Sequence, residues 1–358
     1  MTRYDSIKPG ELWLDTTGNP IQAHGFSVFF KDGLYYWYGE NKERTKAFGT
    51  IWTYGVRCYV SKDFYSWEDK GLIIPPDLDD RTSPLHPGNR IDRPHIVYCS
   101  RNRKYVAWIK VMDGVTNQSM CVMQADDFLG PYEFVRRRYK PLAMDSGDFD
   151  LMVDEESGKA YIVFERPHFE MITATLAEDY CSATGEFSVH FANRKPPYAR
   201  EAPVHFQRDG LHYLFTSGTT SYHPDPSVVA SFHDFHGRYV ILGDLHPADD
   251  SMTSFCSQVS DVIRIPGKKD LFVACADRWE PGFHTKAKQV LVRMLNRIVS
   301  KFYIPDRSPK RERQKLAPRI RLFFHNTNRS RYVFLPIRFD GDRPIIEWRD
   351  EWRLEDFE

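Results

Sequence analysis

This chain lacks long hydrophobic segments. No run of about eighteen apolar residues occurs among its 358 residues, which excludes a membrane-spanning helix. The N-terminal segment Met1–Gly10 also lacks the apolar core of a secretory signal. We therefore expect a cytoplasmic protein from the chain as given, and a secreted or periplasmic one if a signal segment has been removed from it.

Cysteine is scarce and scattered. The six cysteines stand at positions 58, 99, 121, 181, 256 and 275, and no two of them have CxxC spacing. This pattern excludes the common zinc sites, so no metal site is predicted. Because several of the cysteines lie in apparent strands, we expect buried free thiols rather than disulfides.

Net charge is also absent, since 49 Lys and Arg balance 49 Asp and Glu. The balance hides a basic segment, residues 286–331, which holds fourteen Lys and Arg against two acids. Leu291, Leu295, Ile298 and Phe302 fall at helical spacing within it. We favour a solvated insertion with one apolar face on the main fold over a docking element for an acidic partner or anionic polysaccharide. Nucleic-acid binding is not predicted, because no nucleic-acid-binding motif accompanies the charge.

A hairpin pattern recurs five times. Each copy is a short apolar strand, a polar turn and a second strand rich in aromatic or β-branched residues. The copies are Val28–Tyr38, Ile96–Trp108, Leu151–Phe164, Val204–Phe215 and Val262–Ala274. Repeats of this length built from strands predict an all-β, five-bladed β-propeller, with an insertion at about 283–331 in the last blade. We expect residues 1–358 to form one domain.

One polar residue precedes each hairpin by three or four positions. These residues are His24, Asp92, Asp148, Glu201 and Gln258. In a propeller the innermost strand of every blade lines the central axis. The five side chains are therefore predicted to converge on one funnel.

Carboxylates that face each other across such a funnel suit glycoside hydrolysis, in which one carboxylic acid protonates the leaving oxygen. Glu201 is the leading candidate, because burial beside an apolar strand would raise its pKa. Asp148 is a second carboxylate, although Asp145 and Asp150 compete with it for that role. Asp92 is a third. Aromatic faces for sugar stacking are expected from Trp108, Tyr222 and Trp279.

Several segments together resemble glycoside hydrolase family 43, and within it the exo-β-1,3-galactanase branch. They are Asn19-Pro-Ile-Gln-Ala-His-Gly25, Tyr35-Tyr-Trp-Tyr-Gly-Glu-Asn-Lys42, Asp92-Arg-Pro94, Arg200-Glu-Ala-Pro203, Ser257-Gln258 and Ala276-Asp-Arg-Trp279. The resemblance covers nearly the whole chain except residues 283–331. It implies a five-bladed propeller and inverting hydrolysis from the non-reducing end of a glycan.

The resemblance also implies residue roles. Glu201 matches the general acid, and Asp148 matches the carboxylate that modulates it. Gln258 matches a glutamine that the galactanase branch has in place of the usual aspartate base. Glu40 and Asp92 match positions that contact the terminal sugar. Two departures stand out, because Asp92 replaces a glutamate and His24-Gly25 replaces a Gly-Gly pair, which adds His24 to the expected substrate-binding residues.

Three functions follow from these observations. The first is an inverting exo-hydrolase that releases galactose from β-1,3-galactan-type or related plant glycans. The second is an α-L-arabinofuranosidase or β-xylosidase of the same fold, and the third is a carbohydrate-binding propeller without activity. The expected partner is an oligo- or polysaccharide. No cofactor is predicted, and a structural cation on the propeller axis and the oligomeric state are left open.

Overall fold

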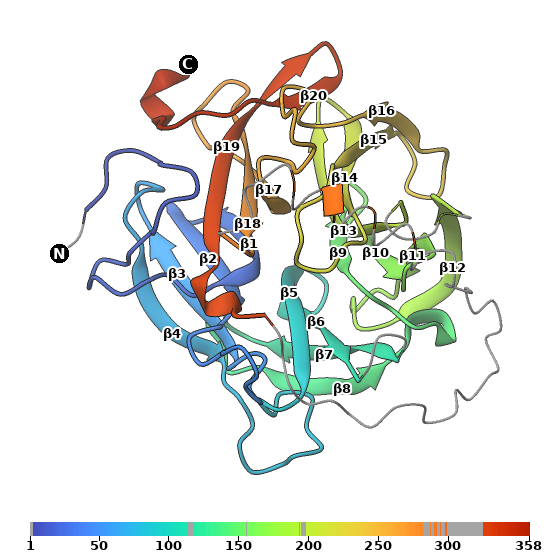
Figure 1. Ribbon diagram of the computed structural model, residues 1–358. Helices are drawn as coiled ribbons and strands as arrows, with labels where there is room; N and C mark the ends of the chain where they lie inside the picture. Colours follow the sequence, from blue (N-terminus) through green and yellow to red (C-terminus); the bar gives the residue numbers. More distant parts are fainter. Residues whose placement is uncertain are drawn as a thin grey trace.

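The computed structural model describes residues 3–113, 117–154, 156–192, 194, 198–281, 287, 290, 291, 294, 298 and 325–358. Five four-stranded antiparallel sheets stand around a common centre, which confirms the predicted five-bladed propeller (Figure 1). Each expected hairpin forms the inner pair of strands of one sheet. The order of strands within each sheet follows the chain, from the axis outwards.

The strands of the first three blades run as follows. Blade 1 contains β1 (His24–Lys31), β2 (Leu34–Glu40), β3 (Val56–Ser61) and β4 (Glu68–Ile74). Blade 2 contains β5 (Arg90–Cys99), β6 (Lys104–Met112), β7 (Gln118–Ala125) and β8 (Glu133–Tyr139). Blade 3 contains β9 (Phe149–Val153), β10 (Ala160–Arg166), β11 (Glu170–Leu176) and β12 (Ala183–His190).

Two further blades complete the ring. Blade 4 contains β13 (Arg200–Arg208), β14 (Leu211–Gly218), β15 (Val228–Phe232) and β16 (Val240–Gly243). Blade 5 contains β17 (Gln258–Arg264), β18 (Phe272–Arg278), β19 (Arg331–Asp340) and β20 (Arg343–Ile346). Three short 3₁₀ turns, Pro141–Ala143, Thr327–Arg329 and Leu354–Asp356, lie outside the sheets.

Local sequence explains the tightest hairpins. Asp32-Gly33 connects β1 to β2, and Asp209-Gly210 connects β13 to β14. Both residues of each pair have positive φ, at 51° and 80° in the first turn and 52° and 79° in the second. Two consecutive left-handed residues match the twist of the strands that they join, and Asp-Gly tolerates that conformation.

The inner strands β1, β5, β9, β13 and β17 contact one another in succession, and β17 returns to β1. Buried carboxylates on the inner strands accept hydrogen bonds from backbone N–H groups of the neighbouring blade. Asp150 of blade 3 accepts the His205 N–H of blade 4 at 2.6 Å, and Asp261 of blade 5 accepts the Val28 N–H of blade 1 at 2.5 Å. At the outer edge the N-terminal segment meets the C-terminal one, where Ile7 pairs with Trp352.

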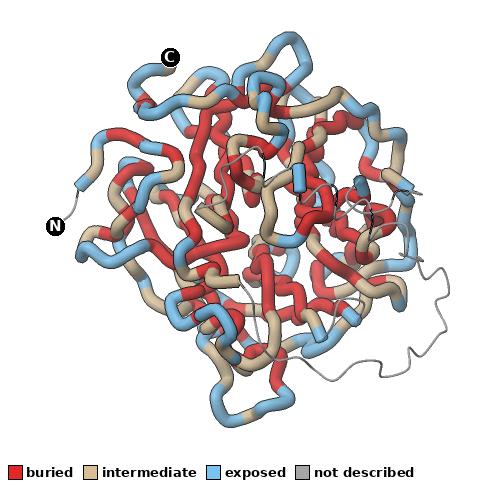
Figure 2. Tube along the Cα trace, in the orientation of Figure 1, coloured by how far each residue is buried: buried red, intermediate tan, exposed pale blue. Residues whose placement is uncertain are grey.

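Buried residues lie mainly in the inner strands of the blades, and exposed residues lie mainly in the outer strands and turns (Figure 2). The largest fully buried side chains are all aromatic except Lys42, and an example is Trp37, which packs between blades 1 and 5. All six cysteines are buried and free, which confirms the expectation of unpaired thiols.

The predicted insertion falls between β18 and β19 of the last blade. Most of the 283–331 segment lies outside the described residues. Positions 287, 290, 291, 294 and 298 are helical, in agreement with the expected helix. Leu291 and Ile298 are more than half exposed, so these two side chains do not form the packed apolar face that the sequence favoured. Among the described residues, no helix has both the length and the apolar character needed to cross a bilayer.

Candidate active site

Irregular backbone at the start of the inner strands places the polar side chains at the axis. In three blades the ladder register shifts directly after the predicted site residue, namely His24, Asp92 and Glu201. The next residue in each case, Gly25, Arg93 or Ala202, has a left-handed φ of 51°, 48° or 50°. Bulges of this kind bend a strand and redirect a side chain, and they are frequent beside active sites.

Glu201 is buried at the start of β13, with 9% of its surface exposed. Its neighbour Arg200 does not neutralise it, because the Arg200 guanidinium donates to the Thr216 and Pro226 carbonyls. Burial, followed by the negative charges of Asp148 and Glu165, raises the pKa of Glu201 well above its ordinary value. A raised pKa favours the protonated form of the carboxyl group, which is the form that a general acid needs.

Asp148 lies directly before β9 and has the opposite character. Lys110 of β6 donates to its carboxylate at 2.8 Å, and the Arg93 Nε lies 3.5 Å away. Burial opposes its ionisation, but these two cations outweigh burial and lower the pKa of Asp148 to about 2. Asp148 is therefore a fixed anion, as the predicted modulator requires. The competing candidates lie elsewhere, since Asp145 pairs with Lys140 and Asp150 with backbone N–H groups.

Glu40, Lys42 and Asp92 form a charged cluster on the side of blades 1 and 2. The Lys42 ammonium is fully buried, 2.6 Å from Glu40 and 3.8 Å from Asp92. Burial raises the pKa of Glu40 to about 8 against the opposing charge of Lys42. A side chain at Gly25 would come within 2.2 Å of the Glu40 carboxylate, so a glycine is required there.

Gln258 begins β17 with both ends of its amide engaged. Its oxygen accepts the Trp279 indole N–H at 3.0 Å, and its nitrogen donates to the Ser217 hydroxyl at 2.8 Å. Ser217 pairs across the ladder with Glu201, so Gln258 lies next to the acid's strand.

A pocket opens here, lined by Ser217, Tyr222, Gln258, Asp277 and Trp279 among others. The Tyr222 ring lies 5.1 Å from Trp279 and 5.9 Å from Trp52, which gives the pocket an aromatic wall. Burial and the charges of Asp92, Glu40 and Asp148 raise the pKa of Tyr222, so its hydroxyl is near the acids. Tyr222 and Trp279 therefore line the pocket, and their stacking on a sugar stays a prediction.

Two predicted substrate-binding residues lie away from this pocket. Trp108 is fully buried in the core between blades 2 and 3, and its indole N–H donates to the Tyr180 carbonyl at 2.8 Å. The expectation that it stacks on a sugar is corrected, because neither ring face is open. His24 is also fully buried, with its ring nitrogens on Asp277 and the Tyr332 hydroxyl. His24 therefore supports residues of the pocket wall and does not line the pocket itself.

Three cations organise these acids and were not predicted from the sequence, namely Lys42, Lys110 and Arg93. Lys42 and Arg93 lie in segments that carried the family resemblance, which was the available signal. The Nη atoms of Arg93 are buried and have no hydrogen-bond partner among the described residues, which leaves donors for oxygen atoms of a ligand.

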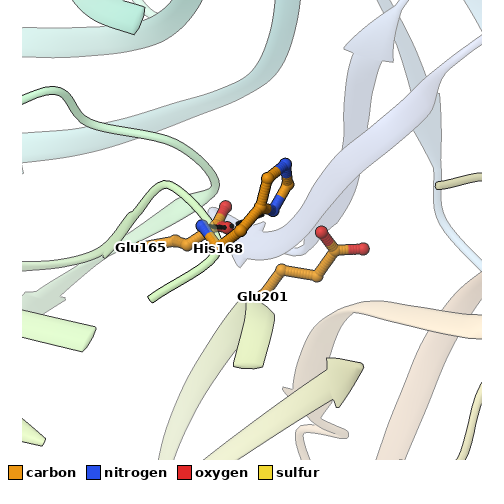
Figure 3. Close-up of side chains that lie close together, drawn as sticks. All are labelled: Glu165, His168 and Glu201. Carbon is orange, nitrogen blue, oxygen red and sulfur yellow. Dashed lines mark hydrogen bonds and ion pairs between the residues drawn. The ribbon is translucent and has the colours of Figure 1, made fainter. Parts of the chain in front are cut away.

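Glu165 and His168 were also missed. In the part of the chain that the structure describes, donor atoms of Glu165, His168 and Glu201 lie within 4.8 Å of one another (Figure 3). The His168 Nδ1 is 3.0 Å from the Glu165 carboxylate. We therefore interpret Glu165 and His168 as an ion pair beside the acid.

A buried acid, a fixed anion beside it and an aromatic pocket on a five-bladed propeller suit glycoside hydrolysis. The sequence profile of glycosyl hydrolases family 43 matches residues 18–297, and the chain belongs to this family. A search of curated proteins finds no match.

Solved structures with the same fold include members of this family. A GH43 β-1,3-galactosidase is 26% identical, with a TM-score of 0.76, and covers 99% of this chain. This chain spans only 65% of the length of that protein. A second GH43 β-1,3-galactosidase, solved with galactodeoxynojirimycin, is 24% identical over 97% of this chain and 100% of its own, with a TM-score of 0.76. An exo-β-1,3-galactanase from Clostridium thermocellum is 23% identical over 97% of this chain and 66% of its own, with a TM-score of 0.74.

Proposed function

We propose that this glycoside hydrolase is exo-acting and inverting, and that it releases galactose from β-1,3-galactan-type or related glycans with Glu201 as general acid. The observation that carries the proposal is the buried Glu201 carboxyl, which faces anions and has no cation of its own, beside a small aromatic pocket. The named activities of the similar structures support the choice of sugar.

The proposed reaction uses two sides of the site. Glu201 donates its proton to the glycosidic oxygen as the bond to the sugar breaks, and a water molecule attacks the opposite face of the sugar. Glu40, Asp92 and Arg93 would hold the sugar hydroxyls, because their polar atoms lie on the side of blades 1 and 2. The Trp279 and Tyr222 rings offer apolar faces to the ring carbons.

Gln258 would position the attacking water. An amide is neutral and needs its imidic-acid tautomer to act as a base. In that tautomer the oxygen usually carries the proton, but here it accepts the Trp279 N–H at 3.0 Å. The hydrogen bond therefore favours the amide form and a positioning role.

The test combines a substrate panel with one variant. The protein is incubated with β-1,3-galacto-, arabino- and xylo-oligosaccharides, and the anomer first released is followed by NMR. We expect α-galactose from the β-linked substrate and, in Glu201→Gln, a fall in kcat of about 10²–10⁴-fold with sugar binding retained.

Asp145→Asn is the matched control, since Asp145 pairs with Lys140 away from the acid and should leave kcat unchanged. Faster release of arabinose or xylose would assign the sugar differently, and turnover that survives Glu201→Gln would remove Glu201 as the acid. No product from any substrate would favour a binding-only propeller.

A further inference from the structure

Two buried carboxyl groups from neighbouring blades, Glu165 of blade 3 and Glu201 of blade 4, lie close together. Glu165 is the penultimate residue of β10 and is 2% exposed, and its carboxyl lies within 4.8 Å of the Glu201 carboxyl (Figure 3). Two carboxylates this close in a buried site repel each other, which favours a proton on one of them. Hydrolysis requires that this proton be on Glu201.

The backbone holds Glu165 in this position. Its N–H donates to the Asp148 carbonyl at 2.7 Å, and its carbonyl accepts the Gly147 N–H at 2.7 Å. A side chain at Gly147 would come within 2.4 Å of the Glu165 carboxylate, so the glycine makes room for it. Glu165 is thus fixed against the segment that carries Asp148.

Among the ion pairs of the described residues, Glu165 pairs only with His168, which lies in the turn between β10 and β11. Both its ring, at 3.0 Å, and its backbone N–H approach the same Glu165 oxygen. Burial lowers the pKa of His168, but the charge of Glu165 outweighs burial and the net shift is upward. His168 also has a left-handed φ of 58°, a strained conformation that such turns adopt near functional sites.

We propose that Glu165, paired with His168, is a positioning residue that assigns the shared proton to Glu201. A histidinium beside one of two competing carboxyls favours the ionised form of that carboxyl, so the proton remains on the other. The negative charge of Glu165 then disfavours the loss of the proton from Glu201 to solvent. This role is separate from that of Asp148, whose charge is offset by Lys110 and Arg93.

Charged groups approach this pair from several elements. They are Lys110 of β6, Asp148 before β9, His168 after β10, and Asp225 after β14. Lys110 favours ionisation of Glu201, whereas Asp148 and Asp225 oppose it.

Glu165→Gln tests the proposal directly. Glu201 acts as an acid below its pKa, so activity falls as the pH rises through that value. Removing the Glu165 charge lowers that pKa, and the alkaline limb of kcat/KM should move down by about one pH unit or more. Aryl galactosides with poor leaving groups should lose more activity than activated ones, because only the former need the proton. These kinetic readings rest on the proposed function.

A substrate-free measurement separates the two proposals. In protein labelled with ¹³C at the glutamate carboxyl, the Glu201 signal is identified by its loss in Glu201→Gln. Its titration midpoint should fall by the same amount in Glu165→Gln. A folded Glu165→Gln protein with an unchanged Glu201 midpoint would overturn the inference, whatever sugar the protein hydrolyses.

His168→Gln supplies a second test with a different signature. Without the histidinium the proton is divided between the two carboxyls, so kcat should fall several-fold while the alkaline limb does not move to lower pH. The double variant should behave like Glu165→Gln alone, since His168 acts through Glu165. Arg166→Gln is the matched control, because it breaks a 2.9 Å ion pair with Glu170 in the same hairpin. An unaltered kcat in His168→Gln, or an effect equal to that of Arg166→Gln, would contradict the proposal.

Discussion

The two sides of the site differ in whether their buried carboxyl groups have a cation as partner. On the side of blades 1 and 2, Glu40 and Asp92 share the buried Lys42, so each of these carboxyl groups has a cation within 4 Å. On the side of blades 3 and 4, Glu201 faces Asp148 and Glu165 and has no ion pair among the described residues. The first side is built to hold polar groups of a ligand in place. The second is built to keep one carboxyl protonated, because unpaired like charges favour the neutral acid.

Removing the cation of the paired side should have the largest effect on stability. Lys42→Met leaves Glu40 and Asp92 buried without their shared partner, and breaking a buried pair costs about 3–5 kcal/mol. The free energy of unfolding in urea measures this loss. Lys104→Met is the control, since its 2.6 Å pair with Asp126 is on the surface and is worth about 1 kcal/mol or less. Equal losses in the two variants would mean that Lys42 does not hold this side together.

A smaller effect is expected where the two sides meet at Gln258. Trp279→Phe keeps an aromatic face but removes the indole N–H that fixes the amide, so kcat should fall about tenfold while KM changes less. Steady-state kinetics separates the two constants. Trp348→Phe, which removes a surface indole bonded to Asp350, serves as the control. If both variants retain full kcat, the orientation of Gln258 does not matter for turnover.

The smallest effect on activity is expected from Trp108. Trp108→Phe should leave KM unchanged, because the ring lies in the core between blades 2 and 3 rather than in the pocket. It should lower stability by about 1–2 kcal/mol, since the Tyr180 carbonyl loses its donor. Michaelis kinetics and urea unfolding measure the two effects. A raised KM with normal stability would restore Trp108 as a sugar platform.

Much of the site was predictable because it lies at repeated positions. Asp92, Asp148, Glu201 and Gln258 each precede an inner strand, and the strands themselves follow from local alternation and turns. Tyr222 and Trp279 were found by residue type alone. Trp108 was misplaced for the same reason, since residue type does not tell a buried aromatic from a lining one. It shares a face of β6 with Lys110 but lies two residues further from the pocket.

The sequence by itself determined the five hairpins, the ring that they form and the row of polar residues at its axis, because strand alternation and turn chemistry are local. Only the tertiary structure decided which charges meet. Lys110 reaches Asp148 from another blade, and His24 meets Asp277 from the far end of the chain. The pairing of Glu165 with His168 is local, but its meaning depends on Glu201, which a separate blade brings within reach. Ring closure sets these distances, and the distances set which carboxyl keeps its proton.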